Sequence, residues 1–327
     1  MSDIVTFGEA MVRLSPPGRE RIEQASTLDM RIGGAELNVA IGATRLGLSA
    51  SWISRLPRNP LGRFMVNQVR QFGVDTSQVL WSDTDRMGVY YIEFGATPRP
   101  TSVTYDRADS AFARIHPSEI DWATAFRGAK VFHTTGITPA LGDGPLNATR
   151  EGLIAAKRAG LHVSFDPNYR AKLWSREDAR NAIVPLLEHV DILVTNGADA
   201  SGILGVECET ERETAHELSE KYGIPTVAIP GREQATAWGH TRRAVMYADG
   251  VLYESNEYRI EMVDMVGGGD SFVSGLLYGI LKSDLQLAIE YGVAFAALKH
   301  TNPGDINYST LEELEQIVSG SGHLIGR

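Results

Sequence analysis

Three successive glycines followed by an aspartate form the stretch with the clearest chemical potential, from Gly267 to Asp270. Glycine adopts positive φ at little steric cost and lets a phosphate approach the main chain closely. An apolar helical pattern begins directly after this turn, and the start of a helix offers free N–H donors and a partial positive charge. Gly267, Gly268 and Gly269 therefore predict an anion site made by backbone donors alone.

Asp270 lies where that helix begins, and its carboxylate suits two different tasks there. It can cap the helix, or it can act as the base that takes a proton from an attacking hydroxyl. An isolated turn of this kind favours the cap. The chain has neither the GxxxxGK[ST] motif of P-loop proteins nor a GxGxxG motif after a strand, so the commoner phosphate-binding interpretations have no support.

The composition of the chain sets further limits on its function. Its 327 residues suffice for one large α/β domain with an insertion. The formal net charge of -10 disfavours nucleic acids and anionic membranes as partners. If the ligands are phosphates, backbone N–H groups, arginines and a metal ion must reverse this repulsive field locally. With no long apolar run, no leader pattern at its start and Cys208 as its single cysteine, the chain is expected to be cytoplasmic.

The elements that must position these residues alternate along the chain. From about residue 130 onward, β-rich runs and amphipathic runs follow each other regularly. Strands are expected at 3–7, 50–56, 131–134, 162–166, 191–195 and 225–229, and helices at 35–46, 61–72, 146–159, 176–189, 211–222, 270–281, 285–300 and 311–317. This order predicts an α/β fold with a doubly wound, mostly parallel sheet and helices on both faces.

Two separated segments interrupt the alternation and predict a second, smaller sheet. Residues 11–33 are broken by prolines and glycine and have no helical period, and residues 87–112 include two β-like runs. We expect these segments to form a small β-sheet lid inserted in a single domain that spans residues 1–327. Residues 234–258 are also rich in strand and turn signals.

Two signatures in the chain resemble those of the ribokinase-like (PfkB) carbohydrate kinases. The run from Gly267 to Phe272 resembles the C-terminal signature of that family, and residues 33–40 (GGAELNVA) with Leu46-Gly47 resemble its N-terminal signature. The two lie in the expected order, more than two hundred residues apart. The resemblance covers nearly the whole chain.

This resemblance implies a central α/β sandwich with a small β-sheet lid over a sugar. Asp270 would be the catalytic base, and Gly267, Gly268 and Gly269 would form the anion hole. The resemblance also implies ATP and Mg²⁺ as cofactors, with the metal carried in by ATP rather than held in a protein cage. It leaves open whether a monovalent cation is needed.

Other stretches resemble 2-keto-3-deoxygluconate kinases and their near relatives within this family. They are residues 7–9 with 13–16, 86–91, 105–111, 166–170 with 173–174, and 299–300 with 303–305. The resemblance implies transfer of a phosphoryl group from ATP to this sugar acid, giving its 6-phosphate. The residues that it implies around the sugar are Gly34, Asn38, Tyr90, Tyr105, Arg107, Arg170 and Asp305.

The two arginines in that set have other uses that the sequence leaves open. A guanidinium can bind the carboxylate of a sugar acid through two parallel charge-assisted hydrogen bonds. Arg107 can instead form an ion pair with Asp106 or Asp109. Arg170 can contact a helix end or an ATP phosphate.

The nucleotide side of the implied site departs from the family pattern. The ATP-binding residues implied by the resemblance are Asn168, Asn196, Gly231, Arg232, Glu233, Gly267 and Gly269. Asp199 stands where the family usually has a glutamate, which implies an indirect contact with Mg²⁺. Gly268 replaces the commoner alanine, and Ile229 and Gln234 replace a lysine and a glycine. Arg232 can supply the missing positive charge, so these changes bear on nucleotide binding and not on the fold.

Three functions remain open from the sequence. The first is an active kinase for 2-keto-3-deoxygluconate or a similar sugar acid, and the second is a kinase for a neutral sugar such as fructose or ribose. The third is a catalytically silent sugar-binding protein on the same fold, which the altered loop at 229–235 keeps open although Asp270 favours an enzyme. The strand expected at 87–94 is apolar on both faces, which predicts a two-fold homodimer through the lid.

Overall fold

A sheet of nine strands forms the centre of the molecule, whose computed structural model describes residues 2–231, 234–236 and 239–320. In spatial order the strands are β15 (Val251–Glu254), β14 (Ala244–Ala248), β11 (Thr226–Pro230), β10 (Ile192–Val194), β9 (His162–Asp166), β8 (Val131–Thr135), β1 (Ile4–Phe7), β4 (Ala50–Pro57) and β5 (Val79–Ser82). The strands from β11 to β5 are parallel, and the hairpin β14–β15 adds an antiparallel edge. The predicted mostly parallel sheet is confirmed.

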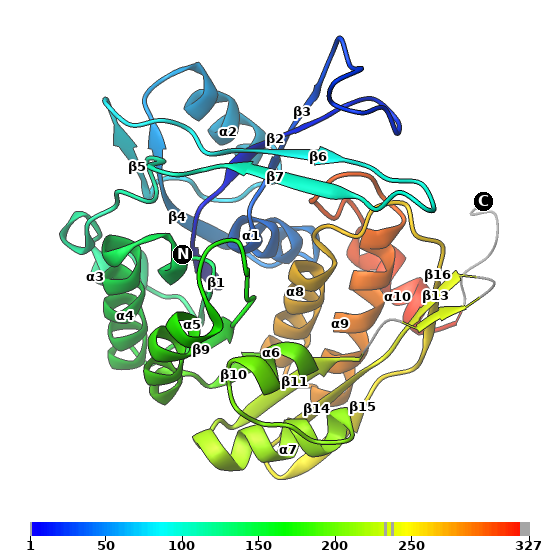
Figure 1. The fold of residues 1–327 in the computed structure, drawn as a ribbon. Helices are drawn as coiled ribbons and strands as arrows, with labels where there is room; N and C mark the ends of the chain where they lie inside the picture. The colour runs from blue at the N-terminus through cyan, green and yellow to red at the C-terminus, as the bar shows by residue number, and fades with distance from the viewer. Residues whose placement is uncertain (1, 232–233, 237–238, 321–327) are drawn as a thin grey trace.

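Helices cover both faces of this sheet (Figure 1). Successive side chains of a strand point to opposite faces, so Ile4 packs in one hydrophobic cluster and Val5 in the other. The first cluster includes side chains of α1 (Ala35–Arg45), α2 (Pro60–Arg70), α8 (Gly268–Leu281) and α9 (Leu285–His300), and α10 (Leu311–Val318) packs on α9. The second includes side chains of α4 (Asp143–Arg158), α5 (Arg176–Ile183) and α7 (Glu211–Tyr222). The chain is therefore doubly wound, as predicted.

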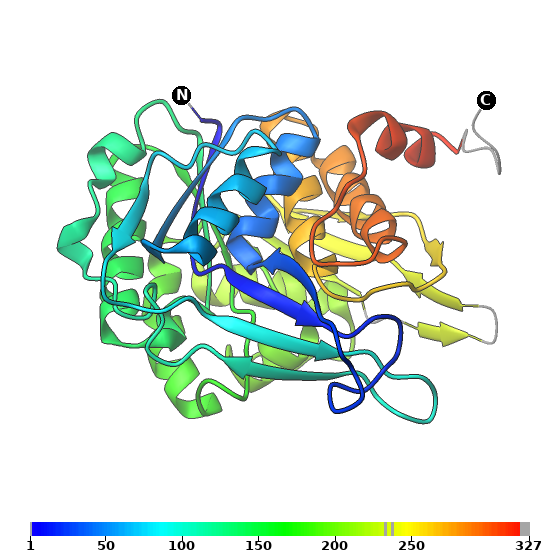
Figure 2. The same ribbon diagram turned by 90° about the horizontal axis from the view of Figure 1, so that it is seen from above.

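A second, smaller sheet lies across one end of the main body (Figure 1). Its strands, in order, are β3 (Asp29–Gly33), β2 (Met11–Ser15), β6 (Val89–Glu93) and β7 (Ser102–Asp106). They fall inside the two segments from which the sequence predicts a lid. Figure 2 shows β2, β6 and β7 side by side along one flank of the molecule, with β7 at the edge of the sheet.

The helix predicted at 176–189 is wrong in its second half. The α-helix α5 ends at Ile183, and a 3₁₀ helix follows at Val184–His189. Pro185 causes the change, because it has no N–H to donate and its ring collides with the preceding turn of an α-helix.

The remaining elements are short. They are α3 (Trp122–Ala125), α6 (Gly197–Gly202), and 3₁₀ turns at Pro117–Glu119 and Pro139–Leu141. A separate three-stranded sheet consists of β12 (Gln234–Thr236), β13 (Gly239–Arg242) and β16 (Tyr258–Ile260). The hairpin β14–β15 turns at Asp249 and Gly250, whose φ angles are 50° and 82°. Within the described ranges, no helix is long and apolar enough to cross a membrane.

Candidate active site

A cavity of about 810 Å³ lies between the small sheet and the carboxyl ends of the central strands. Ligands of open α/β sheets bind at this end of the strands. The predicted site residues that line the cavity are Gly34, Asn38, Tyr90, Tyr105, Arg107, Asn168, Arg170, Asn196, Asp199, Gly231, Gly267, Gly268, Gly269, Asp270 and Asp305. Arg232 and Glu233, also predicted to bind ATP, lie outside the described residues.

The glycine turn before α8 has the backbone that an anion site needs. Gly267 is the N-cap residue of α8 and has a φ of 82°. A Cβ at this position would also collide with the carbonyl oxygen of Asp305, so glycine is required. A Cβ on Gly269 would meet no atom within 4 Å, so the first turn of α8 opens into the cavity. Its unpaired N–H groups can bind an anion there.

Asp270 lines the same cavity directly after this turn. Its Oδ2 accepts a hydrogen bond from Nδ2 of Asn38 across 2.7 Å, whereas the start of α8 has no side-chain cap. Burial raises the pKa of Asp270 to about 6, although the Asn38 donor and the charge of Arg170 oppose this rise. The carboxylate is ionised at neutral pH and can accept a proton, so the geometry favours a base over a cap.

Asn38 joins this carboxylate to the rest of the cavity. It lies in the first turn of α1, whose N-cap is Gly34, and a Cβ on Gly34 would collide with the carbonyl oxygen of Glu9. The Oδ1 of Asn38 is buried and has no hydrogen-bond partner among the described residues. One end of the amide therefore orients Asp270, and the other end is left to accept a hydrogen bond from a ligand.

Asp305 lies at the base of the cavity, and both of its carboxylate oxygens have partners. Oδ1 accepts from Nη1 of Arg13 across 2.6 Å, and Oδ2 accepts from the hydroxyl of Tyr90 across 2.6 Å. Burial raises the pKa of Asp305, and the nearby charge of Arg13 opposes this rise. The contacts that the structure gives Asp305 are with protein groups, and they fix the orientation of Tyr90.

Arg107 forms an ion pair with Glu9, and the alternative pairing with Asp106 or Asp109 is wrong. Its Nε lies 2.9 Å from Oε2 of Glu9, and its Nη2 contacts the same oxygen. The hydroxyl of Ser110 also donates to Glu9. Arg107 and Glu9 both line the cavity. A ligand bound there would therefore meet a guanidinium whose positive charge Glu9 already balances in part.

The aspartates that stand in those predicted pairs have other partners. Asp106 pairs with Arg86 at 2.6 Å, and Asp109 pairs with Arg114 at 3.3 Å. All four of these side chains are well exposed, so these pairs contribute little to stability.

Tyr105 and Lys172 close the cavity at the edge of the small sheet. The ring of Tyr105 stacks on that of Tyr90 with centroids 6.0 Å apart. Lys172, in the loop after β9, donates to the carbonyl oxygen of Val103 on β7 across 2.6 Å. Lys172 was not predicted as a site residue, because a lysine in a polar loop gives no sign that it reaches an edge strand 69 residues away.

Two further carboxylates, those of Asp166 and Asp199, line the cavity. Asp166 ends β9 and accepts from the backbone N–H of Asn168, which has a φ of 41°. Asp199, in α6, accepts from the backbone N–H of Tyr169. Burial raises the pKa of Asp166 to about 8, repulsion from Asp199 adds to this rise, and burial also raises the pKa of Asp199. Neither carboxylate has an ion pair within the described part of the chain.

Two loop residues complete the predicted nucleotide side. Oδ1 of Asn196 accepts from the N–H groups of Ala198 and Asp199 and so caps α6, which orients Asp199 toward the cavity. Arg170 is exposed, and it lowers the pKa values of Asp166, Asp199 and Asp270 through its charge. The predicted contact of Arg170 with a helix end is not formed within the described residues; its Nη1 donates to the carbonyl oxygen of Tyr169, and the residue lines the cavity.

Glu36 is a further buried acid that the sequence analysis left without a role. Its Oε1 accepts from the N–H and the hydroxyl of Thr135 and from the hydroxyl of Thr138. Burial raises the pKa of Glu36 to about 7 against these donors. The contacts tie the start of α1 to the end of β8 and thereby fix Asn38. The residue stands inside the N-terminal signature, which is the signal that singles it out.

Comparison with known proteins identifies the arrangement. The model of the pfkB family of carbohydrate kinases matches residues 1–313. The chain belongs to this family. Residues of both signatures line one cavity, and the resemblance stated from the sequence is confirmed for the family and for the fold.

Three relatives of this carbohydrate kinase are named for 2-dehydro-3-deoxy sugars. It is 41% identical to a 2-dehydro-3-deoxygalactonokinase of Haloferax volcanii, over 100% of this chain and 99% of the relative. It is 30% identical to a 2-dehydro-3-deoxygluconokinase of Bacillus subtilis, over 97% and 95%. The crystal structure of a 2-dehydro-3-deoxygluconokinase from Thermotoga maritima superimposes with a TM-score of 0.94 at 39% identity, over 98% of this chain and 100% of that chain.

Proposed function

We propose that this kinase transfers the γ-phosphoryl group of ATP to the terminal hydroxyl of 2-keto-3-deoxygluconate or of its galactonate epimer, giving the 6-phosphate. The observation that carries the proposal is the position of Asp270 beside the open glycine turn, in a cavity that also holds Arg107 and Arg170. The names of the relatives support a 2-keto-3-deoxy sugar acid as the acceptor.

The base in the proposed reaction is Asp270. Its ionised carboxylate takes the proton of the sugar hydroxyl while the hydroxyl oxygen forms a bond to the γ-phosphorus of ATP. The bond from that phosphorus to the bridging oxygen breaks, and ADP leaves. The N–H groups of the turn at Gly267 to Gly269 hold the charge on the transferred group. Asn38 keeps the base oriented through its Nδ2 and accepts from the sugar through its Oδ1.

The carboxylates of Asp166 and Asp199 fit Mg²⁺. Asp166 and Asp199 supply oxygen donors, the ligands that this ion prefers, and a bound cation would offset the burial that raises the pKa of each. Because its side chain is shorter than that of the glutamate usual in the family, Asp199 would contact Mg²⁺ through a water molecule. When bound with ATP, Mg²⁺ would neutralise part of the charge on the phosphates. This fit supports ATP, bound together with Mg²⁺, as the phosphoryl donor at this site.

The cations of the cavity favour an acidic acceptor over a neutral sugar. Arg107 and Lys172 border the side of the cavity under the small sheet, and Arg170 also lines the cavity. Glu9 pairs with Arg107, whereas Arg170 and Lys172 have no ion pair within the described residues. A sugar carboxylate placed here gains charge-assisted hydrogen bonds that fructose or ribose cannot form.

The outer face of the small sheet supports a homodimer. Leu14 on β2 stands opposite Met30 on β3 and Tyr91 on β6, on the face away from Tyr90 and the cavity. Met30 is 46% exposed. A second copy of the sheet, related by a two-fold axis, would cover this apolar row with an identical row.

The galactonate epimer is a second candidate because the relative at 41% identity is named for it. We would measure kcat/KM for both epimers by coupled ADP release and locate the phosphate in the product by phosphorus NMR. The proposal expects turnover of at least one epimer and a phosphate on its terminal carbon. Turnover of fructose or ribose without turnover of either acid would contradict it, and sugar binding without turnover would favour the silent alternative.

A further inference from the structure

Arg13 reaches from the small sheet to the base of the cavity and joins two carboxylates from distant parts of the chain. Its Nη2 lies 2.9 Å from Oδ2 of Asp264, and its Nη1 lies 2.6 Å from Oδ1 of Asp305. The three side chains are only 2%, 1% and 6% exposed. Arg13 belongs to β2, whereas Asp264 precedes α8 and Asp305 follows α9. A single guanidinium thus ties the small sheet to both ends of this helical pair.

Asp264 transmits the position of Arg13 to the glycine turn. Its Oδ1 accepts from the backbone N–H of Val266 across 3.0 Å, and Val266 directly precedes Gly267. Its Oδ2 accepts from the backbone N–H of Gly304 across 2.9 Å as well as from Arg13. The carboxylate that Arg13 holds therefore fixes the main chain that enters the anion site.

Asp305 links Arg13 to Tyr90, on the side of the cavity where the sugar is proposed to bind. Its Oδ2 accepts from the hydroxyl of Tyr90, whose ring stacks on Tyr105. Its main chain packs against Gly267 so closely that no Cβ fits between them. A displacement of Asp305 would therefore move a wall of the sugar site and the N-cap of α8 together.

The buried charges at this point balance when Lys299 is included. Its ammonium is fully buried and donates to the carbonyl oxygens of Asp264 and Asn302. Arg13 and Lys299 carry two positive charges, and Asp264 and Asp305 carry two negative charges. This balance allows a variant that removes one charge of each sign without leaving an unpaired charge in the interior.

We propose that Arg13 is a positioning residue that couples sugar binding to nucleotide binding. The inference rests on the proposed function in one respect, namely that the sugar binds beneath the small sheet. A sugar that contacts Tyr90 would act on Asp305, and Arg13 would pass the change to Asp264 and the glycine turn. Removal of the guanidinium should leave each site able to bind while the two bind independently.

The test measures the dissociation constant of a non-hydrolysable ATP analogue with Mg²⁺ by calorimetry, without sugar and with a saturating sugar. The sugar is whichever one the wild type phosphorylates, so a failure of the sugar-acid proposal leaves this test intact. We expect the sugar to tighten binding of the analogue by roughly 5-fold or more in the wild type, as is usual for coupled sites. We expect a ratio near one in Arg13→Lys, because an ammonium cannot hold both carboxylates as the guanidinium does.

The double variant Arg13→Met/Asp305→Asn serves if Arg13→Lys does not fold. It keeps the buried charges balanced, and an asparagine can still accept a hydrogen bond from Tyr90. Its ratio is also expected to be near one. A cooperative thermal transition establishes that each variant is folded before the ratio is read.

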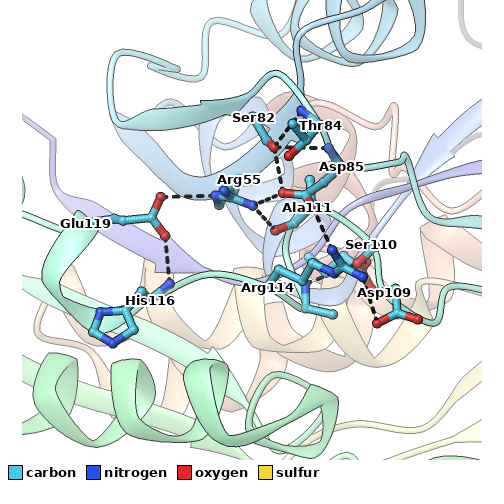
Figure 3. A network of polar contacts seen from close by, with 12 residues as sticks. Arg55, Ser82, Thr84, Asp85, Asp109, Ser110, Ala111, Arg114, His116 and Glu119 are labelled. Atoms are coloured by element: carbon cyan, nitrogen blue, oxygen red, sulfur yellow. Dashed lines mark hydrogen bonds and ion pairs between the residues drawn. The ribbon is translucent and has the colours of Figure 1, made fainter.

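Arg55 provides a matched control away from the cavity. Figure 3 shows it between two carboxylates, with Nη1 2.5 Å from Asp85 and Nε 3.1 Å from Glu119. Arg55→Lys weakens a bridge of the same kind and is expected to lower stability while the ratio stays at its wild-type value. A wild-type ratio near one, or an unchanged ratio in a folded Arg13 variant, would overturn the proposal.

Discussion

Nδ2 of Asn38 lies 2.7 Å from Oδ2 of Asp270, so the first turn of α1 holds the first turn of α8 across 232 residues of sequence. The bond brings the two family signatures into direct contact. It orients a carboxylate whose pKa is raised by burial, and it opposes part of that rise. The proposed base and the group that tunes its pKa therefore come from distant parts of the chain.

Asp270→Asn is expected to lower kcat by roughly 10²–10⁴-fold, the usual contribution of a positioned base. Sugar binding should survive, because the amide is nearly the same size as the carboxylate. The thermal midpoint should not fall at neutral pH, since the change removes a charge that burial disfavours. Steady-state ADP release measures kcat, and thermal melts with and without sugar measure sugar binding and the thermal midpoint. A variant with near wild-type kcat would remove Asp270 from its role.

The pH profile should report Asp270 directly. Its pKa in the folded protein is about 6, so the carboxylate loses its charge as the pH falls through 6, and kcat/KM should then drop by roughly tenfold per pH unit. Asn38→Ala removes the strongest group that lowers this pKa, so the midpoint of the acid limb should move to higher pH. An identical midpoint in both proteins would mean that another group controls the limb.

Arg107→Ala is expected to raise KM for a sugar acid much more than for its neutral analogue. Truncating one partner of a buried charge pair costs on the order of 2–5 kcal/mol, and here part of that cost falls on Glu9, which loses its partner. The double variant Arg107→Ala/Glu9→Gln removes one charge of each sign and separates stability from recognition. Equal changes in KM for both sugars would show that Arg107 does not bind the carboxylate.

Gly268, in the glycine turn before α8, lies directly against the side chain of His300. A Cβ on Gly268 would collide with the imidazole of His300, which is buried and bonded through Nδ1 to the carbonyl oxygen of Asp264. Gly268→Ala should lower kcat and destabilise the fold by about 1–3 kcal/mol, as overpacking does. Adding His300→Ala should recover part of both losses, which enzyme assays and thermal melts would detect. Losses that merely add would show that the two residues are independent.

The outer face of the small sheet should form a dimer contact. Light scattering at micromolar concentration is expected to give twice the chain mass of 35.7 kDa. Met30→Glu, which places a charge in the apolar row, should shift the protein toward the monomer without loss of fold. An active wild-type monomer would contradict this prediction.

Much of the fold was predictable from the sequence because its signals are local. Short, largely apolar β-rich runs such as Ile4–Phe7 indicate strands buried on both faces, and glycines mark the ends of helices. The split of the predicted helix at Pro185 was predictable by the same reasoning, since proline ends an α-helix locally. Local signals, however, do not state which segments pair across the cavity.

The partners of the charged site residues were not predictable in this way. Arg107 has two aspartates within two positions, yet it pairs with Glu9, which is 98 residues away. Arg13 joins carboxylates that lie 251 and 292 residues along the chain. Such pairings depend on the tertiary fold, so the sequence indicates which groups are available and leaves their contacts open.

The most direct test of the account is coupled ADP release by the wild type and Asp270→Asn, side by side, on a panel of sugars with ATP and Mg²⁺. The panel holds 2-keto-3-deoxygluconate, its galactonate epimer, fructose and ribose. The account predicts that the wild type has its highest kcat/KM on one of the two acids and that Asp270→Asn reduces it by about 10²-fold or more. A higher kcat/KM on a neutral sugar, or equal turnover by the two proteins, would contradict it.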